Sequence, residues 1–168
     1  QISLTQSYPS DVGDEPFAGS RLSDAIAWSA DGTRLYTADE GEQDFTGGRG
    51  WSMWSATGEF LWDDSGQLER IAVSYGLYPE GRSDAKGIEV EGIEVGVYGK
   101  RQFAFVGSER GSFVAVYEIT NNGHPRFIQV LPTGIGPEGL LALPQRNLFV
   151  TSDEETGTIS VFEGVQGM

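Results

Sequence analysis

Short runs of alternating apolar and polar residues, separated by tight turns, extend along most of the chain. Runs of this length and period are typical of β-strands. A pair of such runs joined by a turn occurs three times, at residues 24–40, 91–109 and 138–154. In each pair an acidic residue precedes the first run, and an acidic cluster follows the second. The pattern therefore predicts an all-β protein built from an internal repeat.

Each repeat continues into further strands. Third strands are predicted at residues 50–55, 112–119 and 157–163, and fourth strands at 60–62 and 127–131. Sheets of four antiparallel strands are the blades of a β-propeller. We therefore predict a partial β-propeller of about three blades, each with three or four antiparallel strands. A β-sandwich is the alternative, but it does not explain why acidic residues recur at matching places in each repeat.

The repeats form a single domain over residues 1–168. They begin near residues 24, 91 and 138, so the steps between them are 67 and 47 residues. The second step agrees with the roughly 40–50 residues of known propeller repeats. The first step carries an insertion at about residues 63–86, in which residues 68–75 are compatible with one or two helical turns.

Three blades are too few to close a ring, because propellers close with about four to eight. An N-terminal strand predicted at Ile2–Ser7 completes only one blade. At least one terminal sheet is therefore expected to leave an apolar face or a strand edge uncovered. The expected partners are the remaining blades of the same protein, another copy, or another polypeptide.

Several segments resemble the choice-of-anchor I family of bacterial extracellular β-propeller proteins. They follow the family's order, at residues 36–42, 48–59, 63–71, 82–87, 91–117 and 136–140. Where the family reads PEPEG, residues 88–92 read IEVEG and keep both carboxylates. The resemblance implies a propeller fold and an extracytoplasmic location, whether secreted, periplasmic or on the cell surface. Members often carry phosphatase-like, esterase-like or phytase-like labels.

Charge and composition narrow the classes of partner. The chain has 25 acidic and 11 basic residues, which give a formal charge of −14. Such a charge repels nucleic acid and anionic lipid and attracts cations. Because the chain has no cysteine and one histidine, His124, zinc and haem lose their commonest ligands. We expect no haem, zinc or nucleotide, no nucleic-acid partner and no direct membrane insertion, since no apolar run nears about 20 residues.

The acids that flank the repeats are the candidate metal ligands. One set stands at the start of the repeats, and the other follows the second strands: Asp24, Glu91 and Glu138; Glu40, Glu109 and Glu154. Equivalent positions of successive blades converge around the propeller axis, and crowded carboxylates repel one another unless a cation neutralises them. Ca²⁺ accepts six to eight oxygen ligands and suits such a channel. Alternatively, these acids accept backbone N–H groups or pair with nearby basic residues.

Four further residues are candidate substrate-binding groups: Arg82, Asp84, Lys86 and Arg110. Basic side chains beside carboxylates hold a phosphate or acidic group against a metal. The alternative is a loop latched by an Arg82–Asp84 ion pair. Two functions remain open. One is a non-catalytic, secreted or cell-surface module with an acidic, calcium-binding channel within a larger assembly; the other is a metal-dependent phosphatase-, phytase- or esterase-like hydrolase.

Overall fold

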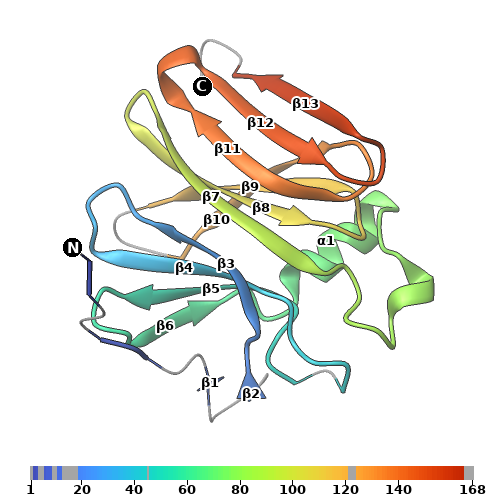
Figure 1. The fold of residues 1–168 in the computed structure, drawn as a ribbon, viewed down its shortest axis with the longest axis horizontal. Coiled ribbons are helices and arrows are strands. Elements are labelled where there is room, and N and C mark those ends of the chain that lie inside the picture. The colour runs from blue at the N-terminus through green and yellow to red at the C-terminus, as the bar shows by residue number, and fades with distance from the viewer. Residues whose placement is uncertain are drawn as a thin grey trace.

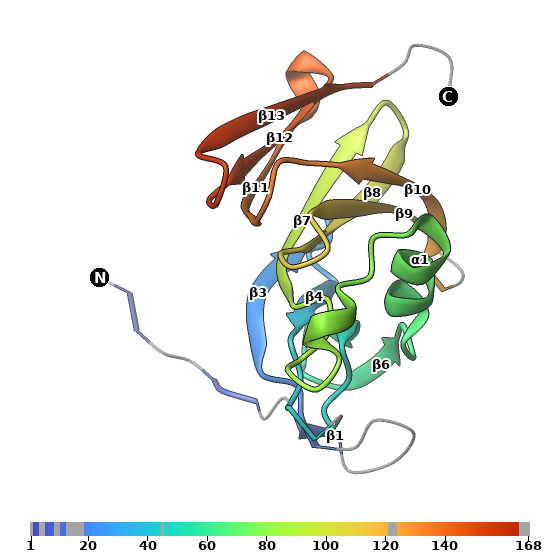
Figure 2. The ribbon, with the colours of Figure 1, turned by 90° about the vertical axis from the view of Figure 1, so that its right-hand side faces the viewer.

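The computed structural model describes residues 2–3, 6–8, 11–12, 19–44, 46–120 and 124–164. Its strands form three larger antiparallel sheets and a short hairpin. The hairpin pairs β1 (Asp11–Val12) with β2 (Gly19–Ser20). The three larger sheets stack side by side as an open fan (Figures 1 and 2).

We number the sheets as blades in chain order. Blade 1 contains four strands, β3 (Ser23–Trp28), β4 (Arg34–Asp39), β5 (Gly50–Ser55) and β6 (Phe60–Asp63). Blade 2 contains four strands, β7 (Val90–Tyr98), β8 (Arg101–Ser108), β9 (Phe113–Ile119) and β10 (Arg126–Pro132). Blade 3 contains three strands, β11 (Pro137–Leu143), β12 (Leu148–Asp153) and β13 (Thr158–Glu163).

The first strands of the blades lie next to one another, with β7 between β3 and β11 (Figure 1). Each of them is followed outward by the later strands of its own blade. This is the arrangement of a β-propeller, with first strands at the axis. The predicted partial propeller of about three blades is confirmed, and the β-sandwich is excluded because the strands form three sheets rather than two facing layers.

The prediction of an N-terminal strand at Ile2–Ser7 is wrong for the residues of this segment that the structure describes. Residues 2–3 and 6–7 are not in a strand, while Leu4 and Thr5 lie outside the described residues. An extended segment needs a sheet edge to pair with. The three-stranded blade 3 has its edge, β13, at the opposite end of the fan from the N-terminus (Figure 1).

The insertion between blades 1 and 2 folds into α1 (Gln67–Tyr75) and the 3₁₀ turn η1 (Glu80–Arg82). A second 3₁₀ turn, η2 (Pro144–Arg146), connects β11 and β12. Asp64 lies just before α1, and its Oδ2 accepts a hydrogen bond from the Leu68 N–H in the first turn at 2.7 Å. The apolar side of α1 is buried in the core between blades 1 and 2 through Leu68, Ile71 and Ala72.

The core consists of two layers, one on each side of blade 2. Alternation along β9 sends Phe113, Ala115 and Tyr117 into the layer shared with blade 1. Val114 and Val116, on the other face of the strand, lie in the layer shared with blade 3. Blade 2 therefore uses one face for the blade before it and the other for the blade after it.

Candidate functional site

The first strand of every blade carries a β-bulge at the same place. In the pairing with the second strand, the register skips one residue between Ser23 and Ala25, between Val90 and Gly92, and between Pro137 and Gly139. The skipped residues are Asp24, Glu91 and Glu138, the first predicted set of acids. Because a bulge leaves its extra residue unpaired and re-aims the side chain, it turns these carboxylates out of the ladder.

The second set of acids is held by a matching backbone contact in each blade. The N–H groups of Glu40, Glu109 and Glu154 donate to carbonyls two residues before the bulged acids, at 3.4, 2.8 and 2.7 Å. The accepting residues are Leu22, Glu89 and Gly136, with φ values of 45°, 46° and 73°. Positive φ is uncommon outside glycine. The same positive φ and the same backbone hydrogen bond recur in all three blades. Each blade therefore holds its bulged acid and its second acid at the same end of the sheet.

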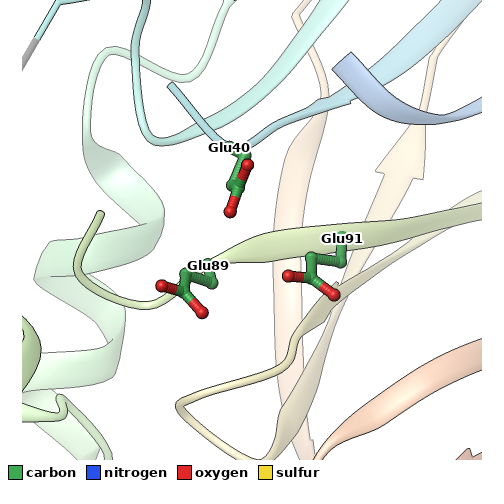
Figure 3. A group of neighbouring side chains, drawn as sticks. All are labelled: Glu40, Glu89 and Glu91. Carbon is green, nitrogen blue, oxygen red and sulfur yellow. The ribbon is translucent and has the colours of Figure 1, made fainter. Parts of the chain in front are cut away.

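Carboxylates from neighbouring blades meet at this end. Oxygens of Glu91, Glu109 and Glu138 lie within 4.8 Å of one another, and so do those of a second group, Glu40, Glu89 and Glu91. Figure 3 shows Glu40 pointing from blade 1 toward Glu89 and Glu91 on blade 2. Glu91 belongs to both groups, so the two predicted sets intermix rather than form separate rings.

We call this cluster the acidic end; it comprises Asp24, Glu40, Glu89, Glu91, Glu109, Glu138 and Glu154. Asp24 is near enough for its charge to raise the pKa of Glu91 and of Glu138. Glu154 shares a hydrogen bond with Glu138. The structure thus brings all six acids named from the sequence to one end of the fan.

Proximity and burial disfavour the charged forms of several of these acids. Burial, followed by the charges of Glu109, Asp24 and Glu40, raises the pKa of Glu91 to about 8. Burial raises the pKa of Glu109, and the hydrogen bond with Glu154 together with burial raises that of Glu138. A bound cation reverses such shifts, because it favours the ionised carboxylates.

Basic side chains border the acidic end. Burial alone pushes the pKa of Glu89 upward, but hydrogen bonds from Arg110 and Arg82 outweigh burial and leave that pKa lowered. Arg110 Nε lies 2.7 Å from Glu89 and 3.2 Å from Glu109. Lys86 pairs with Glu40, and this hydrogen bond raises the pKa of Lys86.

The Arg82–Asp84 latch considered from the sequence is therefore wrong. Arg82 forms its ion pair with Glu89, and Asp84 is exposed in the turns before β7. Of the four candidate substrate-binding residues, Arg82, Lys86 and Arg110 contact the acidic end directly. The physical reason is burial, since Glu89 is 3% exposed and needs compensating charge.

Glu89 is the member of the cluster that repeat matching missed. It stands two residues before Glu91, where blade 1 has Leu22 and blade 3 has Gly136. Only blade 2 has an acid there, so no repeat marks it. The sequence signal that could have identified Glu89 is the family's PEPEG segment, whose two carboxylates are both present in residues 88–92.

Two other buried acids have structural partners instead. Asp39 accepts hydrogen bonds from Ser23 at 3.0 Å and from Ser52. Asp153 accepts from Ser160 at 2.6 Å and from Thr158 at 3.1 Å. These contacts tie together the strands of blades 1 and 3 just before Glu40 and Glu154, and leave the latter two facing the acidic end.

The opposite end of the blades has different chemistry. A cavity of about 420 Å³ lies between blades 2 and 3, beside the turn that joins β7 and β8. Its walls include the aromatic rings of Tyr98, Phe103, Phe149 and Phe162. The described carboxylate groups that are able to share an ion lie at the other end of β7, so the acidic end is the candidate functional site.

Residues 43–122 match the choice-of-anchor I domain. This stretch, just under half of the chain, is similar to the choice-of-anchor I family. The matched stretch contains β5 and β6 of blade 1, the insertion, and β7, β8 and β9 of blade 2, and it includes Glu89, Glu91 and Glu109. The match favours a cell-surface or extracellular protein. Within the described ranges, no helix is long and apolar enough to cross a membrane.

The fold is also shared with a solved structure. A putative 6-phosphogluconolactonase from Bacteroides fragilis is similar with a TM-score of 0.58 and 16% sequence identity. The match covers 89% of this chain and 36% of the bacterial protein, so this chain spans about a third of that protein's length. At this identity the likeness shows the fold alone. No curated protein shows significant similarity to the chain.

Proposed function

We propose that this chain is part of an extracellular β-propeller that binds Ca²⁺ at the acidic end and serves as a non-catalytic structural or binding module within a larger assembly. The carrying observation is the pair of three-carboxylate groups that share Glu91. Acids from all three blades contribute to the acidic end, so a bound ion would connect blades that the sequence joins only through loops.

The spacing of the carboxylates fits a calcium ion. Ligand oxygens lie about 2.3–2.6 Å from Ca²⁺, so two oxygens on one ion are at most about 5 Å apart. The oxygens of each group lie within 4.8 Å of one another. Three carboxylates supply only part of the six to eight oxygens that Ca²⁺ takes, and waters or carbonyls complete such sites in a flexible geometry.

The charge of the site also supports a cation. With a pKa of about 8, Glu91 holds a proton at neutral pH when no ion is bound. A divalent cation favours loss of that proton, since it compensates the buried charge of the Glu91 carboxylate and offsets the charges of Glu109, Asp24 and Glu40. Ion binding and proton release are therefore coupled at Glu91.

The hydrolase is the less supported alternative. Arg82 and Arg110, which would hold a substrate phosphate, both donate to the buried Glu89. Moving either guanidinium to a substrate would weaken the compensation of that buried charge. In a non-catalytic module, by contrast, Arg82 and Arg110 can keep their hydrogen bonds to Glu89.

Isothermal titration of the chain with CaCl₂ at pH 7, in two buffers of different ionisation enthalpy, tests the proposal. We expect binding with release of on the order of one proton per ion, because Glu91 is protonated below a pKa of about 8. At pH 9 the release should largely vanish, since Glu91 is then ionised before binding.

Glu91→Gln should abolish the proton release and weaken binding at least tenfold, whereas Glu59→Gln, at an exposed position in the turn before β6, should leave both unchanged. Absence of binding in the wild-type chain would contradict the proposal. Binding that Glu91→Gln does not affect would contradict the assignment of the site.

A further inference from the structure

The two faces of each blade are used in a fixed order. A row of three residues crosses each sheet through paired positions on its first, second and third strands. In blade 1 the row is Ala27, Tyr36 and Met53, and in blade 2 it is Glu94, Phe105 and Val116. We call this the forward face, because it packs against the next blade along the chain.

The forward faces of blades 1 and 2 are covered. Tyr36 is 0% exposed and Met53 is 6% exposed in the core against blade 2. Phe105 is 6% exposed and stacks on Phe149 of blade 3, with ring centroids 4.1 Å apart. The interface between successive blades is therefore established twice within the chain.

The same row in blade 3 is uncovered. Its members are Leu141, Val150 and Val161. Leu141 is 51% exposed and Val161 is 59% exposed, and the neighbouring Ile159 is 71% exposed. In blades 1 and 2 the equivalent positions are covered by the next blade.

The composition of this face is not that of a terminal cap. Terminal repeats of stacked architectures need a polar outer face for solubility. Blade 2 has Glu94 in its row, and blade 3 covers it with a hydrogen bond from the Ala142 N–H at 3.4 Å. Blade 3 has Leu141 at the equivalent position, so its exposed face is more apolar than the covered face of blade 2.

The opposite end of the fan has the complementary face, which we call the rear face. Ile26 on blade 1 is 63% exposed and Trp28 is 49% exposed. Ile26 stands two residues after the bulged acid, as do Ile93 in blade 2 and Leu140 in blade 3. Both of those equivalents pack toward the preceding blade, Ile93 in the core with blade 1 and Leu140 in the core with blade 2.

We propose that the forward face of blade 3 packs against the rear face of blade 1 of a second copy of this chain. Each junction would repeat the packing that already joins blades 1, 2 and 3. Two copies joined at both ends would have six blades, within the about four to eight that close a propeller.

Sedimentation velocity of the wild-type chain and of two charge variants tests the docking. Val161→Lys places a charge on the forward face, and Ile26→Lys places one on the rear face; both positions are exposed, so folding should persist. The wild-type chain should form dimers or larger species. Each variant alone should sediment as a monomer, because each keeps only one working face.

An equimolar mixture of the two variants should form a heterodimer, through the intact forward face of Ile26→Lys and the intact rear face of Val161→Lys. Thr57→Lys, in the exposed turn before β6, is the matched control and should associate like the wild type. Near-ultraviolet circular dichroism should be the same for all four proteins. A monomeric wild type, variants that still associate alone, or a mixture that stays monomeric would each overturn the proposal.

Discussion

Replacing Trp51 with alanine is expected to lower the free energy of unfolding by about 4 kcal/mol, as for other large buried aromatic residues. Trp51 is 0% exposed, and its ring centroid lies 4.9 Å from those of Trp62 and Tyr117 and 6.0 Å from that of Tyr36. The contact with Tyr117 joins blade 1 to blade 2, and truncation of Trp51 leaves a cavity in the larger core layer. Urea unfolding of the variant and the wild type measures the difference.

Val73→Ala is the control for this prediction. Val73 is 59% exposed on α1, and its truncation should change the free energy of unfolding by no more than about 0.5 kcal/mol. A Trp51→Ala variant as stable as Val73→Ala would show that the two blades do not share the tightly packed core described here.

Calcium is expected to raise the melting temperature of the wild-type chain. An ion that binds only the folded state adds about 2.7 kcal/mol at a concentration about 100-fold above Kd. For a chain of this size that free energy corresponds to roughly 5–10 °C. Glu91→Gln should lose most of this shift, because it removes the carboxylate common to both groups.

Differential scanning calorimetry in CaCl₂ and in EDTA measures the shift. Glu59→Gln should respond like the wild type, and Mg²⁺ should stabilise less, since it requires a stricter octahedral geometry and keeps its waters. Equal melting temperatures in calcium and EDTA for the wild type would contradict a stabilising ion.

The strands were predictable because alternation is a local signal. The predicted third strand at residues 50–55 and fourth strand at 127–131 correspond to β5 (Gly50–Ser55) and β10 (Arg126–Pro132). Gathering of the repeated acids was predictable as well, because equivalent positions of stacked blades must lie close together. The repeat alone therefore indicated both the architecture and the position of Asp24, Glu91 and Glu138.

The details of the acidic end depend on features with no local pattern. The bulges at Asp24, Glu91 and Glu138 are set by the pairing of two strands, so alternation within one strand does not reveal them. Glu89 has no acidic counterpart in blades 1 and 3, so repeat matching passed over it. Its burial in turn decides the partner of Arg82, which sequence proximity had suggested to be Asp84.

The N-terminal strand shows the converse error. Alternation at Ile2–Ser7 suggests a strand, but a strand also needs an edge with unpaired N–H and C=O groups. The N-terminus lies at the blade 1 end of the fan (Figure 1). Ile2 is fully exposed. Where the edges lie is a property of the whole fold.

Anomalous diffraction from crystals of the wild-type chain grown with CaCl₂ is the most direct test of the acidic end as a calcium site. We predict a peak at which an oxygen of Glu91 and oxygens of at least two of its neighbours in the acidic end lie about 2.3–2.6 Å from the ion. The peak should be absent from Glu91→Gln crystals grown under the same conditions. A map with no peak at the acidic end, and with Glu89, Glu40 and Glu109 paired only with Arg82, Lys86 and Arg110, would contradict the account.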